Sequence, residues 1–401
     1  MHIWDDKKGY LQIPYRKYAY VKDSSGQHIS LYGDRLKRVT SFDKDDPTLH
    51  ESDIPPMTRF LVDQYGDSDE ISTGHRVMFF DIEVEVTEGF PDVQKAYNPI
   101  TSIALYDYAT EKYYTYCFDP HERIESYKKD NEEVEFYKTE YEMLNKFFQK
   151  YMEIQPTIIS GWNSEFFDIP YLYNRAVRIL GHKVAKLLSP ISKVIYSDYK
   201  KKHNIVGVSS LDYLQLYRQF TFTQQSSYRL DYIGEIEVGM KKVSYEGTLN
   251  DLYDNVKILV ELDKKLNFIE IARGIAHLGH IPYEDINMSS RWLEGAILVY
   301  LKKIGVIAPN KPGRPKKMND DKFAGAYVQD PQSGKHDWVY DLDITSMYPS
   351  VIRSLNVSPE TKIGKVEGWN PEQFIKESNT KTYSLMNKHD KEIGKMTETE
   401  L

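Results

Sequence analysis

Several features that would place a protein in a specialised class are missing from this chain of 401 residues. It has one cysteine, Cys117, which excludes an intramolecular disulfide and is typical of a reducing cytoplasm. No apolar run reaches the length of a membrane span, and residues 1–6 do not read as a secretory signal peptide. The net charge of −8 argues against a uniformly basic protein that coats nucleic acid. We therefore expect a cytoplasmic protein that neither spans a membrane nor depends on disulfides.

The residues that are present indicate a multidomain α/β protein. The length suffices for two or three domains with their own cores, and 40% hydrophobic and 28% charged residues are typical of globular chains. Residues 1–75 mix short strand-like runs with polar turns, whereas strand and helix signals alternate over 76–305. A linker rich in proline, glycine and lysine over 309–318 opens the third part, 306–401.

The pattern within these parts predicts individual elements. Strands are expected at 18–21, 103–106, 114–118 and 157–159, helices at 140–151, 171–180 and 256–266, and a hairpin over 194–208.

An acidic strand is the most informative segment. Residues 77–84 read Val-Met-Phe-Phe-Asp-Ile-Glu-Val, and in a strand Asp81 and Glu83 would share one face while the apolar side chains at 78, 80, 82 and 84 take the other. Two adjacent carboxylates repel each other unless a cation lies between them, and a pair of divalent ions with oxygen ligands would supply that charge. The alternative, an edge strand with a solvated acidic face, explains this segment equally well.

A second acidic residue lies where a loop enters a helix. Residues 160–175 read Ser-Gly-Trp-Asn-Ser-Glu-Phe-Phe-Asp-Ile-Pro-Tyr-Leu-Tyr-Asn-Arg, which places Asp168 at the helix start and Pro170 in the first turn. Taken alone, Asp168 reads as a helix N-cap whose carboxylate accepts from backbone N–H groups.

A third segment repeats the acidic-strand pattern. Residues 338–353 read Trp-Val-Tyr-Asp-Leu-Asp-Ile-Thr-Ser-Met-Tyr-Pro-Ser-Val-Ile-Arg. They predict an apolar strand with Asp341 and Asp343 on one face, followed by a turn at Tyr348 and Pro349. An ordinary turn would explain Tyr348 and Pro349, but not the whole run from 343 to 353.

Together, these three segments resemble the family B DNA polymerases, most nearly the replicative enzymes of large tailed bacteriophages. The first two resemble exonuclease motifs and the third resembles polymerase motif A. The resemblance implies a partial β-rich N-terminal domain over 1–75, an RNase H-like 3′→5′ exonuclease domain with a mixed sheet over 76–305, and the beginning of a palm over 306–401.

The resemblance also implies roles for individual residues. Asp81, Glu83 and Asp168 would be catalytic metal ligands of the exonuclease, and Asp343 would be the metal ligand of the palm. Each site would use two ions, Mg²⁺ or Mn²⁺. The residues expected to contact DNA or nucleotide are Asn163, Phe167, Gly325, Ala326, Ser346, Met347 and Tyr348, the last packing against the incoming sugar.

The partners implied are DNA and other proteins of replication. The DNA would be a primer-template or a single-stranded 3′ end, and a completed palm would take a dNTP. A C-terminal polymerase polypeptide is the expected protein partner and a sliding clamp is a further candidate, whereas no membrane is expected. For a viral protein the compartment would be the host cell cytoplasm.

The third exonuclease motif departs from the family pattern. The family places a tyrosine, three residues and an aspartate before an apolar helix, but here Asn255 precedes that helix and Asp251 stands in the tyrosine's place. Asp254 could serve as the catalytic ligand if the helix began one residue earlier, although one residue rotates a side chain by about 100°. Two functions therefore stay open: a proofreading exonuclease, or a weak or inactive DNA-binding scaffold of a split polymerase.

The second departure concerns polymerisation. No candidate for the fingers helix or for the later Asp-Thr-Asp motif follows Asp343 before residue 401. Because two ions need carboxylates from both palm strands, we expect no polymerisation by this chain alone.

Overall fold

The computed structural model describes most of the chain. The described residues are 1–5, 7–43, 46–70, 72–86, 89–121, 125–198, 201–241, 254–311, 329–358, 361, 363–369, 381–387 and 391–397. They divide into two compact units, 1–314 and 315–401. The expected segment around Gly325 and Ala326, and Asp251 of the third motif, lie outside the described residues.

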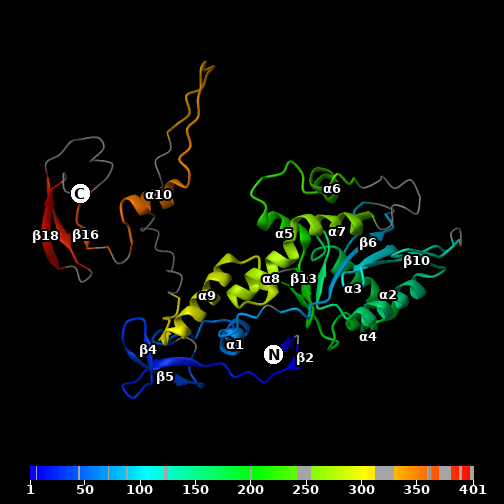
Figure 1. Cartoon of the computed structure of the whole chain (residues 1–401), viewed down its shortest axis with the longest axis horizontal. Helices are drawn as coiled ribbons and strands as arrows, with labels where there is room; N and C mark the ends of the chain where they lie inside the picture. Colours follow the sequence, from blue (N-terminus) through cyan, green and yellow to red (C-terminus); the bar gives the residue numbers. More distant parts are fainter. Residues whose placement is uncertain are drawn as a thin grey trace. The chain divides into compact units, whose positions relative to one another are not determined.

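A seven-stranded mixed sheet is the centre of the first unit (Figure 1). Its order is β14-β11-β6-β7-β8-β10-β9, with parallel pairing of β14 with β11, β11 with β6 and β8 with β10, and antiparallel pairing elsewhere. The strands are β6 (Val77–Val84), β7 (Ile100–Asp107), β8 (Lys112–Phe118), β9 (Tyr127–Lys129), β10 (Glu132–Tyr137), β11 (Ile158–Ser160) and β14 (Ser209–Ser210).

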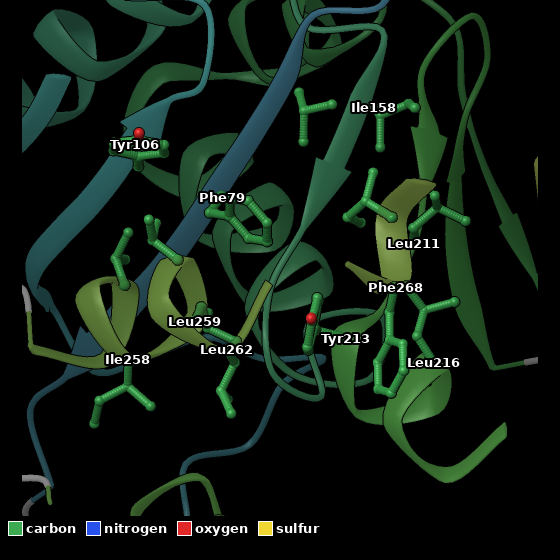
Figure 2. Close-up of a cluster of buried hydrophobic side chains, with 14 of the residues drawn as sticks. Phe79, Tyr106, Ile158, Leu211, Tyr213, Leu216, Ile258, Leu259, Leu262 and Phe268 are labelled. Carbon is green, nitrogen blue, oxygen red and sulfur yellow. The ribbon is translucent and has the colours of Figure 1, made fainter. Parts of the chain in front are cut away.

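Helices cover both faces of this sheet because its central strand is apolar on both sides. Val77 and Phe79 of β6 join one hydrophobic cluster, whereas Met78, Phe80 and Ile82 join another. The first cluster is closed by α5 (Tyr213–Phe220), α6 (Leu230–Val238), α7 (Asp254–Leu266) and α8 (Phe268–Gly279), and Figure 2 shows Phe79 with the α7 side chains of Ile258, Leu259 and Leu262 in this cluster. The second is closed by α2 (Glu140–Ile154) and α3 (Asp168–Leu180).

Smaller elements complete the first unit. A four-stranded sheet has the order β15-β4-β5-β3, and β1 pairs with β2. The bounds are β1 (His2–Asp5), β2 (Gly9–Gln12), β3 (Ala19–Lys22), β4 (His28–Ser30), β5 (Arg35–Val39), β15 (Val306–Ile307), α1 (Pro56–Tyr65), α9 (Ser289–Lys303), α4 (His182–Ala185), η1 (Lys186–Leu188) and η3 (Tyr283–Asp285). The N-terminal sheet thus includes residues from the far end of the unit.

Most predicted elements are confirmed. The hairpin is formed by β12 (Val194–Ser197) and β13 (Lys202–Ile205), and the strands and helices expected between 18 and 266 occur as β3, β7, β8, β11, α2, α3 and α7. Among the described residues no helix has the length and apolarity to cross a membrane.

The second unit corrects one prediction. Residues 338–343 form no strand, and Met347–Ser354 form a helix, α10, where a turn at Tyr348 and Pro349 was expected. A lone apolar segment has no ladder to complete, because strands gain their hydrogen bonds only from neighbours. Pro349 is tolerated in the first helical turn, where its missing N–H would have had no partner. The only sheet described in this unit joins β16 (Lys365–Val366), β17 (Thr382–Met386) and β18 (Glu392–Thr397).

A buried ion pair fastens α3 to α2. The guanidinium of Arg175 donates through Nε and Nη2 to the two carboxylate oxygens of Glu140, at 2.8 and 2.5 Å. The same guanidinium donates to the carbonyls of Ala96 and Tyr97, and Glu140 also accepts the Ile100 N–H. Every charged atom is therefore paired, which a buried ion pair requires.

Arg175→Met should lower the free energy of unfolding by about 3 kcal/mol, because the Glu140 carboxylate would stay buried without its counter-charge. The measurement is urea unfolding of the full chain. Lys264→Met is the control, since it breaks an exposed pair with Glu261 and should cost about 0.5 kcal/mol or less. Equal costs for the two variants would contradict the prediction.

Candidate active site

The site forms at the part of strand β6 that extends beyond its pairing with β11. The pairing of β11 with β6 runs from Ile158 opposite Val77 to Ser160 opposite Phe79 and then ends. The chain leaves in a loop, residues 161–167, and returns as helix α3. Beyond the end of this pairing, the backbone N–H of Ile82 donates a hydrogen bond to the carboxylate of Asp168, with 3.1 Å between N and Oδ1. The Asp168 carboxylate thus accepts the hydrogen bond that a neighbouring strand would otherwise accept from β6.

The position of Asp168 corrects its interpretation as a helix cap. Phe167 is the N-cap of α3 and Asp168 is the first helical residue, and its side chain reaches across to another element. The carboxylate is buried, and burial together with the charge of Asp81 raises the pKa of Asp168 well above its usual range. Two carboxylates therefore share a poorly solvated site.

The first turn of α7 brings a neutral side chain to the acidic strand. The amide Nδ2 of Asn255 donates to Asp81 Oδ2 at 2.8 Å and to Glu83 Oε1 at 3.2 Å. One N–H₂ group thus bridges the two carboxylates, which share a face of β6 as the alternation predicted. Asn255 is therefore a residue of α7 that contacts this pair, and Asp254 precedes it as the first residue of the helix.

The carboxylates fit a divalent cation in chemistry but not in number. Their oxygens are the ligands that Mg²⁺ prefers, and a cation would offset the repulsion between Asp81 and Asp168. However, within the described part of the chain no three His, Cys, Asp or Glu side chains are grouped closely enough to hold a metal ion. The donor that α7 supplies is an amide, which brings no charge.

An apolar hollow of about 530 Å³ opens beside Glu83. The Phe90 ring is largely exposed there and packs against Phe167, with 5.2 Å between ring centroids. The lining residues are Ile82, Glu83, Val84, Val86, Gly89, Phe90, Pro91 and Phe167. Sequence analysis found Phe167 but missed Phe90. Its only signal was an aromatic residue between Gly89 and Pro91 in a turn, which does not indicate what lies opposite.

The remaining predicted site residues are placed as follows. Asn163 lies in the loop before α3 in the left-handed conformation (φ 62°), and its N–H donates to Asp212, another residue that sequence analysis missed. Asp343, Ser346, Met347 and Tyr348 lie in the second unit and are exposed.

Comparison with known sequences identifies the family. The sequence model of the DNA polymerase family B exonuclease domain matches residues 58–233, and that of DNA polymerase family B matches residues 287–398. This chain belongs to DNA polymerase family B. The matched exonuclease domain of this family B chain implies an RNase H-like fold for the seven-stranded sheet.

Phage and archaeal polymerases are among the relatives of this family B chain. It is 31% identical to the DNA-directed DNA polymerase of Escherichia phage RB69 over 347 residues, and 29% identical to that of Enterobacteria phage T4 over 346. It is 27% identical to DNA polymerase 2 of Aeropyrum pernix over 320 residues. These alignments cover 76, 76 and 75% of this chain but only 38, 38 and 36% of the relatives. The chain thus spans little more than a third of the length of these relatives.

Asn255→Asp should destabilise the family B chain when metal ions are absent. The change removes two hydrogen bonds and adds an anion beside Asp81 and Glu83, so we expect a loss of about 2 kcal/mol of unfolding free energy. Thermal unfolding in EDTA measures the loss, and adding Mn²⁺ should restore most of it. Asn145→Asp makes the same change on the outer surface of α2 and should respond to neither condition. Identical melting of Asn255→Asp and the unsubstituted chain in EDTA would contradict this.

Proposed function

We propose that the first unit acts as a 3′→5′ exonuclease of a family B DNA polymerase, with its activity reduced by Asn255. The observation that carries the proposal is the convergence of three segments on strand β6. Asp81 and Glu83 come from the strand itself, Asp168 binds the Ile82 N–H, and Asn255 bridges the acidic pair. These segments are more than 80 residues apart in the chain, and their meeting is what a nuclease site requires.

In this proposal the hollow beside Glu83 receives the single-stranded 3′ end. Phe90 and Phe167 offer aromatic faces on which bases can stack without regard to sequence. Stacking there would place the last phosphodiester near the carboxylates of Asp81, Glu83 and Asp168. Mg²⁺ or Mn²⁺ held by these carboxylates would activate a water and offset the charge of the phosphate. The protein side chains orient the strand end and keep bulk water from the terminal base.

Asn255 sets the level of this activity. A second ion needs another anionic ligand, and an amide at this position supplies none. One lost transition-state contact of this kind commonly costs about 10²–10³ in rate. The exonuclease should therefore hold the second ion more weakly than the first.

The second candidate function is a DNA-binding scaffold without nuclease activity. The bridge from Asn255 to both carboxylates favours it, because the amide already occupies part of the charge-compensating role of a cation. In that case the hollow with its two phenylalanines would bind strand ends without cutting them.

The polymerase part of the proposal rests on the second unit. We propose the division 1–75, 76–305 and 306–401 for N-terminal, exonuclease and initial palm domains, with Asp343 as a palm metal ligand and Tyr348 against the sugar of a dNTP. Gly325 and Ala326 would lie near the template, and Ser346 and Met347 near the nucleotide. A C-terminal polypeptide would complete the palm on a primer-template, and a sliding clamp would hold it on DNA.

The nuclease test compares variants of the third motif on single-stranded DNA with a labelled 5′ end. We expect digestion by the unsubstituted chain to be weak or undetectable with Mg²⁺, and Asn255→Asp to raise its rate about 10²–10³-fold. Asp168→Asn added to Asn255→Asp should remove the gain, and Asn145→Asp should change nothing.

Two outcomes would decide against this assignment. Robust digestion that Asp254→Ala abolishes, with no response to Asn255→Asp, would make Asp254 the ligand. No digestion by either chain, with unaltered binding of the DNA end, would favour the scaffold.

The polymerase test uses a primer-template, dNTPs and Mg²⁺. The 401 residues alone should not extend the primer, because two-metal transfer needs carboxylates on neighbouring palm strands and residues 338–343 form no strand. Adding a C-terminal polymerase polypeptide should give extension, and Asp343→Ala should remove it. Extension by the 401-residue chain alone would contradict the prediction.

A further inference from the structure

Asp212 is a buried carboxylate that binds two different segments. Its Oδ1 accepts the N–H of Leu214 at 3.0 Å, which caps helix α5, and also the N–H of Asn163 at 3.1 Å. Its Oδ2 accepts the N–H of Glu165, again at 3.1 Å. A helix cap needs one acceptor oxygen, so the two remaining contacts go beyond capping. Both lie in the loop 161–167 that leads to Asp168.

The carboxylate is held rigidly on its own side. Leu211 and Tyr213, the neighbours of Asp212 in the chain, are buried in the hydrophobic cluster that Figure 2 shows. Backbone hydrogen bonds join the same stretch to the start of the loop, from Leu211 N to the Ile159 carbonyl and from Tyr213 N to the Gly161 carbonyl, each at 2.9 Å. Asp212 therefore presents its oxygens to the loop from a fixed position.

Hydrogen bonds within the loop connect the segment held by Asp212 to Asp168. The carbonyl of Asn163 accepts from Phe167 N and the carbonyl of Ser164 accepts from Ile169 N, so the turn held by Asp212 leads directly into α3. Asn163 has φ 62°, a conformation that a non-glycine residue adopts at a cost and that its N–H bond to Asp212 stabilises. On its other side the loop is tied by Glu165, whose carboxylate binds Lys202 of the hairpin at 2.7 Å.

We propose that Asp212 is a positioning residue, which fixes the loop 161–167 so that the Asp168 carboxylate stays against the N–H of Ile82. Its consequence for catalysis rests on the exonuclease proposed above, whereas its consequence for Asp168 does not. Asp212 touches neither DNA nor metal ligands in this scheme and acts only through the loop.

The charge of Asp212 supports this role. Burial raises its pKa to about 6, although the N–H groups of Glu165 and Asn163 oppose the shift. The charge of Glu165 adds to this increase, and the charge of Asp212 in turn helps to raise the pKa of Asp168. Above pH 6 it is nevertheless ionised and can accept on both oxygens. A serine could cap the helix without placing a charge in a buried position. The ionised carboxylate of Asp212 is therefore better explained by its two hydrogen bonds to the loop.

The test separates the cap from the loop with two variants of the full chain. Asp212→Ser keeps a hydroxyl that can cap α5 but is too short to bind the loop, and Asp212→Ala removes both functions. Thr139→Ala is the matched control, because it removes the N-cap of another helix, α2, where Thr139 Oγ1 accepts from Glu142 N. The readout is amide hydrogen exchange of Ile82 at pH 7.5, followed by NMR on a chain labelled with ¹⁵N-isoleucine.

Asp212→Ser should accelerate exchange of the Ile82 amide about tenfold, the factor expected for loss of one hydrogen bond, with little change in melting temperature. Thr139→Ala should leave Ile82 unchanged while lowering the melting temperature. Unchanged Ile82 exchange in Asp212→Ser would overturn the proposal and leave Asp212 as a cap only.

A second measurement tells failure of this proposal from failure of the proposed function. Mn²⁺ binding, read by electron paramagnetic resonance, should weaken in Asp168→Asn and also in Asp212→Ser, but not in Thr139→Ala. If the unsubstituted chain bound no Mn²⁺, the metal chemistry would fail, and Ile82 exchange would still decide the role of Asp212.

Discussion

Repulsion between carboxylates at the open side of β6 is the constraint around which the first unit is organised. Asp81 and Asp168 raise the free energy of each other's ionised form, and burial of Asp168 strengthens the effect because water cannot screen the charges. Two hydrogen-bond donors among the described residues are directed at this spot: the Ile82 N–H donates to Asp168, and the Asn255 amide donates to the β6 pair. These hydrogen bonds offset part of the repulsion between the carboxylates.

The two hydrophobic clusters explain how Asn255 and Asp168 come to lie beside β6. Alternation along β6 sends side chains to both faces, and each face then needs its own layer of helices. Helix α7 packs on the face that carries Asp81 and Glu83, so its first turn lies over them and delivers Asn255. Helix α3 packs on the opposite face, and its first residue, Asp168, accepts the Ile82 N–H at the edge of the strand. The packing of α7 and α3 on the sheet therefore places the N-terminal end of each helix beside the carboxylates of β6.

The local sequence pattern predicted the part of the site that depends on the alternation of side chains along a strand. The face shared by Asp81 and Glu83 follows from strand alternation. The third motif had left Asp254 and Asn255 open, and the structure shows that Asn255, in the first turn of α7, contacts the pair. Asp212 and Phe90 were missed because their importance depends on what lies opposite them in space. The strand expected at 338–343 failed for a related reason, since strand formation depends on a neighbour that local sequence does not contain. The comparison with known sequences identified the family, and the structure identified the hydrogen-bond partners of the site residues.

The pairing of β15 with β4 has a consequence for synthesis on the ribosome. Val306 lies opposite Ile29, and the Glu51 carboxylate accepts the N–H of Ala308 at 2.9 Å. The N-terminal sheet therefore lacks one of its four strands until the whole nuclease layer has been translated. Domains generally fold in order of emergence, but here the earliest residues must wait for some of the latest. We expect the seven-stranded sheet to fold first during translation, and the N-terminal sheet to close behind it as the final step of the first unit.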